Sequence, residues 1–300
     1  MTKPFALLLS TLIFLNFSCS PQENQSTQIA WDSWGVPHIT ADTTDGIFFA
    51  QGWAQMHNHA NTILELYGNS RGRAAEYWGK DNVQNDMLIH TLGFEELAEV
   101  WGETQDPEQK NIYKAFVRGL NSYAEAHPEA IADKNKVVLP ITTNDINMHS
   151  MYVIFTRFIA GGDLGRVQQW PDLGSNAYAI APKKSASGNA MLVQNPHLPW
   201  WKEFLFFESH LRLGDKNMYG VTLVGLPGIS IGFNENLGWS HTNNPIDNAD
   251  TYELELKDGG YLLDGERKDF ETSSKTIKIK INDSTRSEER RVGKEGRSRW

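Results

Sequence analysis

The spacing of apolar residues changes near position 174, from a helical repeat to alternation. In the first half, apolar side chains recur three or four residues apart, as on the buried face of a helix, at Ile112, Phe116, Leu120 and Tyr123. The preceding Asp106-Pro107-Glu108-Gln109 predicts the helix start, because it supplies an N-cap aspartate, a first-turn proline and a capping-box glutamine. Residues 45–66 predict a second helix, so we expect the first half to be mainly helical.

In the second half the apolar residues alternate with a period of two, which is typical of strands. Gly and Pro turn signals at 213–215, 226–228 and 234–236 separate the segments. The pattern predicts strands at residues 176–181, 190–194, 204–211, 218–224, 229–233 and 251–256. Helices followed by strands predict the α+β class, and periodicity alone says no more than this.

The first two predicted strands form a hairpin, since Ser187-Gly188-Asn189 is a turn signal between them. Ser175 lies at the open end of that hairpin, directly after Gly174. In an intact chain such a serine is unremarkable, and a Gly-Ser pair at a strand start does not by itself indicate catalysis. If the Gly174–Ser175 bond is cut, however, Ser175 carries a hydroxyl and a free α-amine. That amine titrates near pH ~8 and can act as the base for its own hydroxyl.

Four motifs that follow one another between Trp31 and Leu256 indicate a function for this serine. They are Asp32-Ser33-Trp34-Gly35-Val36-Pro37-His38-Ile39, Gly72-Arg73-Ala74-Ala75-Glu76, Gly174-Ser175-Asn176-Ala177 and Gly238-Trp239-Ser240-His241-Thr242-Asn243-Asn244. With these motifs the chain resembles the penicillin acylase family of N-terminal-nucleophile hydrolases, which includes acyl-homoserine-lactone acylases. The resemblance implies a sandwich of antiparallel sheets flanked by helices, incomplete in this chain.

The resemblance also implies roles for individual residues. Ser175 would be the nucleophile for cleavage after Gly174 and for substrate turnover through an ester acyl-enzyme. His197 falls where lactone and lipopeptide acylases of the family carry a histidine beside the α-amine, and where penicillin G acylases carry glutamine. Asn243 matches the position whose backbone amide stabilises the oxyanion, and His241 would share its strand face. For His197 the alternative is a structural hydrogen bond in the Pro-His-Leu-Pro turn.

Further positions match the acyl pocket of the family. Arg157 and Phe158 correspond to its aromatic gate, and Leu198, Trp200 and Ile231 correspond to its walls. Each of these residues would be equally at home in a hydrophobic core. The stretch from Phe158 to Ser175 is short, so we do not expect a long excised spacer peptide.

A structural calcium ion is the one cofactor that the resemblance implies, and no organic cofactor is expected. Its ligands would be Asp247, Ala249 (through its carbonyl) and Asp250, with Asp163 from the helical half. Oxygen ligands of this kind suit calcium, although aspartates in turns more often cap or solvate. His57 and His59 are two residues apart in a predicted helix and point to different faces, so they do not predict a metal pair.

The N-terminus predicts export. Residues 1–19 have Lys3, an apolar core too short to span a bilayer, and Cys19. A cysteine directly after a signal core, followed by a polar linker at 20–30, resembles a bacterial lipoprotein site. We therefore expect the periplasm or outer membrane of a Gram-negative bacterium, with a lipid anchor on Cys19. The alternative is an incidental cysteine in an ordinary signal peptide. Cys19 is the only cysteine of the sequence, so no intrachain disulfide can form.

The final residues, 286–300, differ in composition from the rest, with six basic and three acidic side chains. Without them the 28 basic and 37 acidic residues become 22 and 34, so the net charge moves from −9 to −12. An acidic body without a basic patch argues against nucleic-acid binding. We interpret 286–300 as a non-native tail. Family members continue well beyond this point, so we expect a fragment with an α-subunit region at 31–174 and the start of a β-subunit region at 175–285. The second oxyanion donor would lie in the missing part.

The sequence therefore predicts an exported, self-processing amide hydrolase that removes the acyl group from a small N-acylated substrate. Candidate substrates are β-lactams, N-acyl-homoserine lactones and acyl peptides, and His197 favours a lipid-like acyl chain. One alternative is a peptidase-like hydrolase that uses the same site. Another is a non-catalytic surface lipoprotein that keeps the fold as a binding scaffold.

Overall fold

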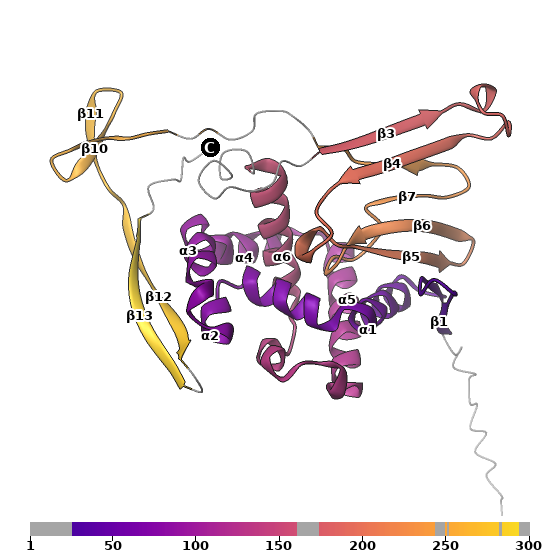
Figure 1. The fold of residues 1–300 in the computed structure, drawn as a ribbon, viewed down its shortest axis with the longest axis horizontal. Helices are drawn as coiled ribbons and strands as arrows, with labels where there is room; N and C mark the ends of the chain where they lie inside the picture. The colour runs from indigo at the N-terminus through magenta and orange to yellow at the C-terminus, as the bar shows by residue number, and fades with distance from the viewer. Residues whose placement is uncertain (1–25, 161–173, 244–249, 251, 282–283, 294–300) are drawn as a thin grey trace, which may run out of the picture.

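A computed structural model describes residues 26–160, 174–243, 250, 252–281 and 284–293. Helices fill the first half of the described chain and strands dominate the second (Figure 1). The helices are α1 (Thr44–Ser70), α2 (Ala74–Trp78), α3 (Val83–Leu92), α4 (Phe94–Thr104), α5 (Pro107–Ala126) and α6 (Thr143–Val153). Short 3-10 turns are η1 (Lys80–Asn82), η2 (Pro128–Ala130), η3 (Asp133–Val138), η5 (Pro182–Lys184) and η6 (Lys202–Phe204), and η4 (Ile154–Ile159) is π-helical.

Both predicted helices are confirmed. Residues 45–66 belong to α1, which continues to Ser70. Asp106 is the N-cap of α5, where its side chain accepts a hydrogen bond from the Gln109 backbone N at 2.8 Å. His57 and His59 lie in different surroundings, as predicted: His57 stacks on Trp53, whereas His59 meets the edge of Phe207.

The main sheet has six strands in the order β1-β2-β5-β6-β7-β8. They are β1 (Thr27–Trp31), β2 (Pro37–Ala41), β5 (Phe206–Leu213), β6 (Lys216–Leu223), β7 (Ile231–Phe233) and β8 (Gly238–Trp239). All neighbours are antiparallel except β2 and β5, which pair in parallel and set His38 opposite His210. Their Nδ1 atoms lie 2.8 Å apart and link the N-terminal hairpin to the centre of the sheet.

Three smaller sheets complete the described strands. The hairpin of β3 (Gly174–Ile180) and β4 (Met191–His197) confirms the predicted pair at the start of the second half. Strands β9 (Glu255–Lys257), β10 (Gly260–Leu263) and β11 (Glu266–Asp269) form a three-stranded sheet. The prediction of a strand at 251–256 was therefore wrong except for its last two residues. Residues 204–205 also differ from the prediction, because Phe204 ends the 3-10 turn η6.

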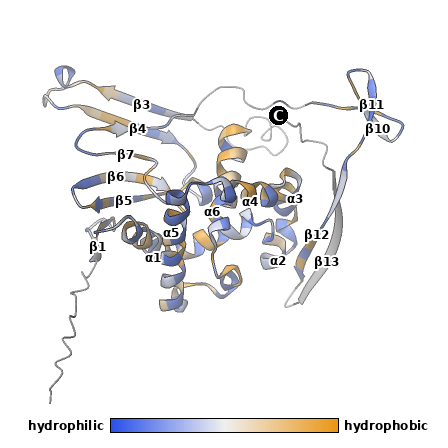
Figure 2. Ribbon diagram, turned by 180° about the vertical axis from the view of Figure 1, so that it is seen from behind, coloured by the Kyte–Doolittle hydropathy of each residue, from blue (hydrophilic) through white to orange (hydrophobic). Residues whose placement is uncertain are grey.

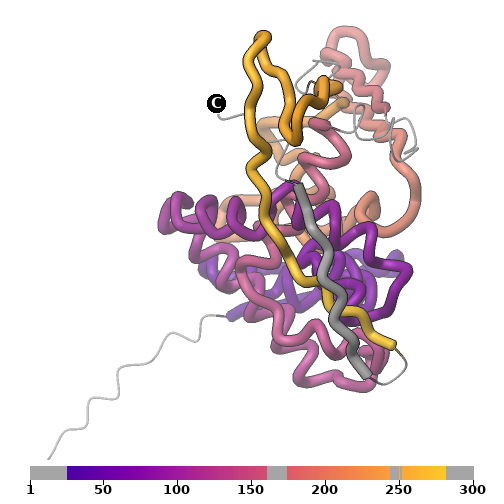
Figure 3. The backbone as a smooth tube through the Cα atoms, turned by 90° about the vertical axis from the view of Figure 1, so that its left-hand side faces the viewer, coloured from indigo at the N-terminus to yellow at the C-terminus, as the bar shows by residue number. Residues whose placement is uncertain are grey.

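Strand β12 (Thr272–Ile281) runs beside the helices (Figure 3) and pairs with β13 (Ser284–Gly293) in a long hairpin. Ile277 and Ile279 of β12 are buried against Ala75 and Val83 of the helical half. The backbone of β13 covers the first part of the segment that we interpret as a non-native tail. That interpretation stays a prediction.

The core joins the helical layer to one face of the main sheet. Side chains of α1 and α5, such as Leu64 and Phe116, pack with Ile39 of β2 and Phe207 of β5. The two helices approach closely because glycines face the partner backbone: a Cβ on Gly52 would lie 2.1 Å from the Phe116 carbonyl oxygen. The described chain is thus α+β, with helices against largely antiparallel sheets, and the predicted fold class is confirmed.

Two glutamines of α1 fasten this helix to the turn between β6 and β7. Gln51 and Gln55 are fully buried and lie one helical turn apart. Gln55 accepts from Gly225 N and donates to Leu226 O, both at 2.8 Å. Gln51 makes the same pair of bonds to Gly228 N and O, also at 2.8 Å. Four backbone groups of the turn are satisfied by two side chains.

The same turn receives two more side chains from the helical layer. Tyr67 of α1 donates its hydroxyl to Gly225 O at 2.6 Å, and His149 of α6 lies 3.2 Å from Val224 O through Nε2. Gly225 has φ +89°, and a Cβ there would lie 3.2–3.3 Å from His149 and Tyr67. Glycine therefore meets both the backbone conformation and the close packing at this point.

Replacing Gln55 with Met should destabilise the protein by about 2–4 kcal/mol. The shape of the side chain is kept, but Gly225 N and Leu226 O lose their partners in the interior, and each unsatisfied group costs about 1–3 kcal/mol. Chemical denaturation measures the change. Gln84, exposed on α3, gives the matched control: Gln84→Met should change stability by less than about 0.5 kcal/mol. Equal effects of the two substitutions would contradict the role of Gln55.

Stability should also fall between about pH 6.5 and pH 4 because of His149. Burial lowers the pKa of this histidine to about 4, against ~6.5 in an unfolded chain. The unfolded state therefore binds the proton first as the pH falls. The contribution of His149 to the free energy of unfolding is complete above pH 6.5, and on the order of 3 kcal/mol of it is lost by pH 4. His149→Gln should flatten this part of the stability curve measured by urea unfolding at several pH values, and an unchanged slope would contradict the assignment.

Candidate active site

The hairpin β3–β4 places the predicted nucleophile and its histidine at one end. In the antiparallel register Gly174 lies opposite His197, and Ser175 lies opposite Pro196. Pro196 has no backbone N–H, so this rung of the ladder lacks a donor on the β4 side. The Gly174–Ser175 peptide thus lies at a weakly paired end of the hairpin. Figure 2 shows polar and apolar residues mixed along both strands, and Tyr178 and Met191 are exposed.

The Ser175 hydroxyl is directed back at the peptide bond that precedes it. Its Oγ donates to the Gly174 carbonyl oxygen at 2.6 Å. Both residues are half-buried. The hydroxyl therefore lies beside the carbonyl group that it would attack in a self-cleavage reaction. A hydrogen bond to the carbonyl oxygen holds the two groups together in the uncleaved chain.

His197 lies on the neighbouring strand, opposite Gly174. Its Nδ1 would be 3.4 Å from a Cβ built on Gly174, so the ring lies over the Gly174 backbone. Its Nε2 is 3.2 Å from the Asn195 Nδ2 amide, which is a donor. With Nε2 accepting, the proton of the neutral ring belongs on Nδ1, the nitrogen that faces Gly174. The side chain is exposed and reachable by solvent.

The hairpin is tied to the edge of the main sheet near the predicted oxyanion segment. Gln194 of β4 donates through Nε2 to Trp239 O of β8 at 3.1 Å, and the Trp239 indole donates to Ser230 O at 2.8 Å. His241 and Asn243 follow β8 by two and four residues and are exposed. The topology brings this segment to the sheet edge beside β4, and the oxyanion role of Asn243 stays a prediction.

The predicted gate residues lie in η4, where the described part of the helical half ends. Arg157 forms an ion pair with Glu203 of η6, with Nη2–Oε1 at 2.7 Å, and donates to the Tyr152 hydroxyl at 3.1 Å. Both charged side chains are largely buried, at 13% and 9% exposed. Phe158 meets the edge of Phe204 at 6.5 Å between ring centres. Glu203 was not found from the sequence, because a single glutamate between Lys202 and Phe204 does not show which distant charge it meets.

The predicted pocket-wall residues are in contrasting surroundings. Ile231 is buried in β7, Leu198 is half-buried, and Trp200 is 95% exposed. Trp200 thus presents its ring to solvent three residues after His197. The contribution of these residues and of Phe158 to an acyl pocket stays a prediction.

The calcium prediction falls mostly outside the described residues. Asp163, Asp247 and Ala249 lie there, whereas Asp250 is described and exposed. Within the described ranges, no group of three or more His, Cys, Asp or Glu side chains is placed to share a metal ion. Cys19 and the predicted export signal also lie outside the described residues. Among the helices that are described, none has the length and apolar character needed to cross a membrane.

Comparison with known proteins identifies the family of the chain. A family model described as penicillin amidase matches residues 26–296. The acyl-homoserine lactone acylase PvdQ of Pseudomonas fluorescens is 28% identical over 89% of this chain and 40% of its own length. Aculeacin-A acylase of Actinoplanes utahensis is 25% identical over 78% of this chain and 36% of its own length.

Among solved structures, a thermostable penicillin G acylase from Alcaligenes faecalis matches 45% of this chain and 74% of that chain, with 23% identity and a TM-score of 0.41. The chain spans about two fifths of the length of the curated relatives that it matches. Since the family model covers most of the chain, and its match includes both Ser175 and His197, the resemblance found in the motifs is confirmed: the chain belongs to the penicillin amidase family.

Proposed function

We propose that this chain is part of a self-processing acylase that hydrolyses the amide bond of a small N-acylated substrate through Ser175. One observation carries the proposal: Ser175 Oγ is hydrogen-bonded to the Gly174 carbonyl, while His197 lies over the same peptide from the neighbouring strand. Membership of a family whose named members include acylases supports the reaction class.

Self-cleavage would begin with attack of Ser175 Oγ on the carbonyl carbon of Gly174. The C–N bond breaks, the nitrogen gains a proton, and Gly174 becomes esterified to the serine hydroxyl. Water then hydrolyses the ester. Gly174 then ends one chain with a new carboxylate, and Ser175 begins the other with a free α-amine. The hydrogen bond of 2.6 Å keeps the hydroxyl beside the reacting carbonyl before the reaction starts.

Turnover would use the α-amine that cleavage creates. The amine takes the proton from Oγ as the hydroxyl attacks the substrate carbonyl, and the amine leaving group departs with that proton. His197 would orient the α-amine by accepting one of its N–H bonds at Nδ1, which already faces this end of β3, so that the amine keeps its lone pair for the Oγ proton. In the cleaved enzyme the ring would then carry its proton on Nε2, with the Asn195 amide turned so that its oxygen accepts. The backbone N–H of Asn243 would stabilise the oxyanion. Water finally releases the acyl group as a carboxylic acid.

The substrate class remains as broad as the chemistry of the site allows. β-Lactams with an acylamino side chain, N-acyl-homoserine lactones and acyl peptides all present an acyl amide outside any ring to such a nucleophile. Two relatives carry the names acyl-homoserine lactone acylase and aculeacin-A acylase. Together with a histidine at position 197, these names support a substrate with a lipid-like acyl chain.

Three accessory features complete the proposal. The α and β chains formed by cleavage would stay together, since Arg157 and Glu203 pair across the cleavage point. The oxygen donors of Asp163, Asp247, Ala249 and Asp250 have the chemistry that calcium prefers, and the ion would have a structural role. Export and a lipid on Cys19 would place the enzyme at the cell envelope.

Processing gives the most direct test. In the whole protein we expect cleavage between Gly174 and Ser175, because an internal serine has no free amine to serve as base. N-terminal sequencing of the larger product should begin Ser-Asn-Ala-Tyr. Ser175→Ala should remain one chain. A wild-type enzyme that hydrolyses amides as a single uncut chain would disprove the mechanism, and a protein that is neither cut nor active would support the binding scaffold.

His197→Ala should lower turnover by on the order of 10²-fold, in the range of a positioned acid–base group. His197→Gln, which keeps hydrogen-bonding capacity, should retain more activity than His197→Ala. His127, near the end of α5 and away from the hairpin, gives the control: His127→Ala should leave turnover unchanged. Measuring kcat on already cleaved enzyme separates this effect from processing. Full activity of His197→Ala would place the histidine in a structural role.

A further inference from the structure

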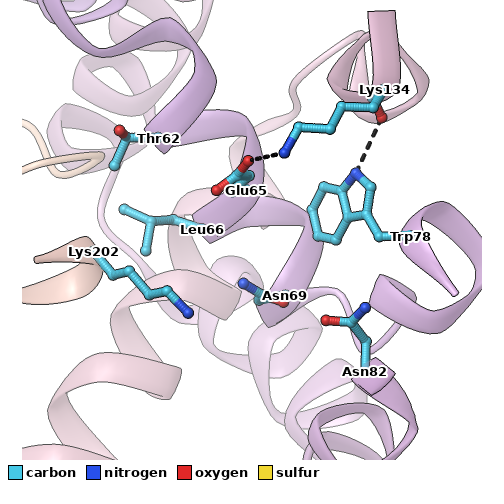
Figure 4. Close-up of a pocket in the computed structure, with 8 residues that line it drawn as sticks. All are labelled: Thr62, Glu65, Leu66, Asn69, Trp78, Asn82, Lys134 and Lys202. Atoms are coloured by element: carbon cyan, nitrogen blue, oxygen red, sulfur yellow. Dashed lines mark hydrogen bonds and ion pairs between the residues drawn. The ribbon is translucent and has the colours of Figure 1, made fainter. Parts of the chain in front are cut away.

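A cavity of about 200 Å³ is lined by residues of α1, α2, η1, η3 and η6, and by none of the hairpin that carries Ser175 (Figure 4). None of the predicted catalytic or acyl-pocket residues lines it. Its walls combine an apolar surface with charged and amide side chains. Its volume is below the ~300–1,000 Å³ of sites for drug-sized ligands, so it fits a molecule with a single ring or a short chain.

The apolar surface consists of Leu66 of α1 and the indole of Trp78 of α2. Trp78 is held from two sides. Its Nε1 donates to the Lys134 carbonyl at 3.0 Å, and its ring packs on Gly68, where a Cβ would lie 2.3 Å from the indole. Because the only polar atom of the ring is already bonded, what Trp78 offers a ligand is its aromatic surface.

The two lysines that line the cavity differ in their ion pairing. Lys134 is neutralised by Glu65, with Nζ–Oε1 at 2.9 Å. Lys202 enters from η6 on the other side of the cavity, and Figure 4 shows its ammonium group directed towards Asn69. Among the residues that the structure describes, the Lys202 ammonium has no hydrogen-bond or ion-pair partner. Lys202 is exposed, so its ammonium is solvated and gives the rim of the cavity a positive charge that no described side chain pairs, beside the Asn69 amide.

The backbone conformation of Lys202 favours a binding role for its side chain. Lys202 has φ +47°, a left-handed conformation that L residues other than Asn and Asp seldom adopt and that glycine adopts freely. A lysine therefore stands where the backbone favours glycine. Strained positions of this kind cluster at binding sites.

We propose that this cavity binds a small organic carboxylate with a flat or apolar body. The carboxylate would accept hydrogen bonds from Lys202 Nζ and the Asn69 amide, and the body would lie against Leu66 and Trp78. A bare inorganic anion would leave the aromatic wall unused, and a cation would meet the free ammonium group. The site is separate from the proposed catalysis, although Lys202 precedes Glu203, the partner of Arg157, in the same turn.

The probe for this site is 4-fluorobenzoate, followed by ¹⁹F NMR titration of the protein. We expect saturable binding at one site, and acetate and inorganic phosphate should bind at least tenfold more weakly. Lys202→Gly should weaken 4-fluorobenzoate binding at least tenfold, because a charge-assisted hydrogen bond is lost. The same variant should unfold at a temperature equal to or above that of the wild type, since glycine suits the left-handed backbone. Loss of binding then cannot be attributed to loss of folding.

Further variants locate the site. Lys202→Met, which keeps the backbone strain and removes the charge, should lose binding like Lys202→Gly, whereas the matched control Lys136→Met on η3 should bind normally. Ser175→Ala should also bind normally, which separates this cavity from the proposed active site. The proposal is overturned by the absence of saturable binding, by unchanged binding in both Lys202 variants, by loss of binding in Ser175→Ala, or by phosphate binding as tightly as 4-fluorobenzoate.

Discussion

The clamp between the two buried glutamines of α1 and the β6–β7 turn is the interaction on which the rest of the structure depends. Gln51 and Gln55 each bind one N–H and one C=O of the turn. The turn packs against the helical layer, with Gly225 buried and Leu226 and Gly228 half-buried, so its polar groups have limited access to water, and a buried group left unpaired would cost about 1–3 kcal/mol. The glutamines let the sheet bury this turn beneath α1 and α6 without that cost. They also fix the helix in rotation and along its axis, because two side chains one turn apart must both reach their partners.

From this turn a short series of contacts leads to the proposed nucleophile. The turn leads into β7 through Ser230, whose carbonyl oxygen accepts from the Trp239 indole. Trp239 O in turn accepts from Gln194, the middle residue of β4. The hairpin that carries Ser175 is thus anchored at its middle, through side chains, to an edge strand of the main sheet. Its own faces remain largely exposed, so its position depends on these few polar contacts more than on packing.

Local signals in the sequence were sufficient for local structure. The Asp106 cap, the helical spacing after it and the turn at Ser187-Gly188-Asn189 each specify geometry within a few residues, and each was predicted correctly. The motifs placed Ser175 and His197 at one end of a hairpin, which the register confirms. Strand 251–256 was misplaced because alternation in a polar stretch does not show where pairing begins.

Contacts between distant segments could not be predicted in the same way. The parallel pairing of β2 with β5 joins residues about 170 positions apart, and no periodicity in either strand specifies its partner. Gln51 and Gln55 look like ordinary polar residues of an amphipathic helix, since their burial depends on a turn far along the chain. Glu203 is comparable: only the fold shows that it lies against Arg157.

The positions of these distant contacts bear on what self-cleavage would do to the molecule. Gln51, Gln55, Tyr67 and Arg157 precede Ser175, and their partners at 203 and 225–228 follow it. Cutting the chain before Ser175 would therefore remove one covalent link and leave the clamp and the Arg157–Glu203 pair in place. Separating the two chains would expose the apolar face shared by α1 and β5, break the Arg157–Glu203 ion pair and leave the glutamine clamp without its partners. The interactions that assemble the precursor are thus the ones that would keep the cleaved enzyme together, and the new α-amine would form in a site that is already built.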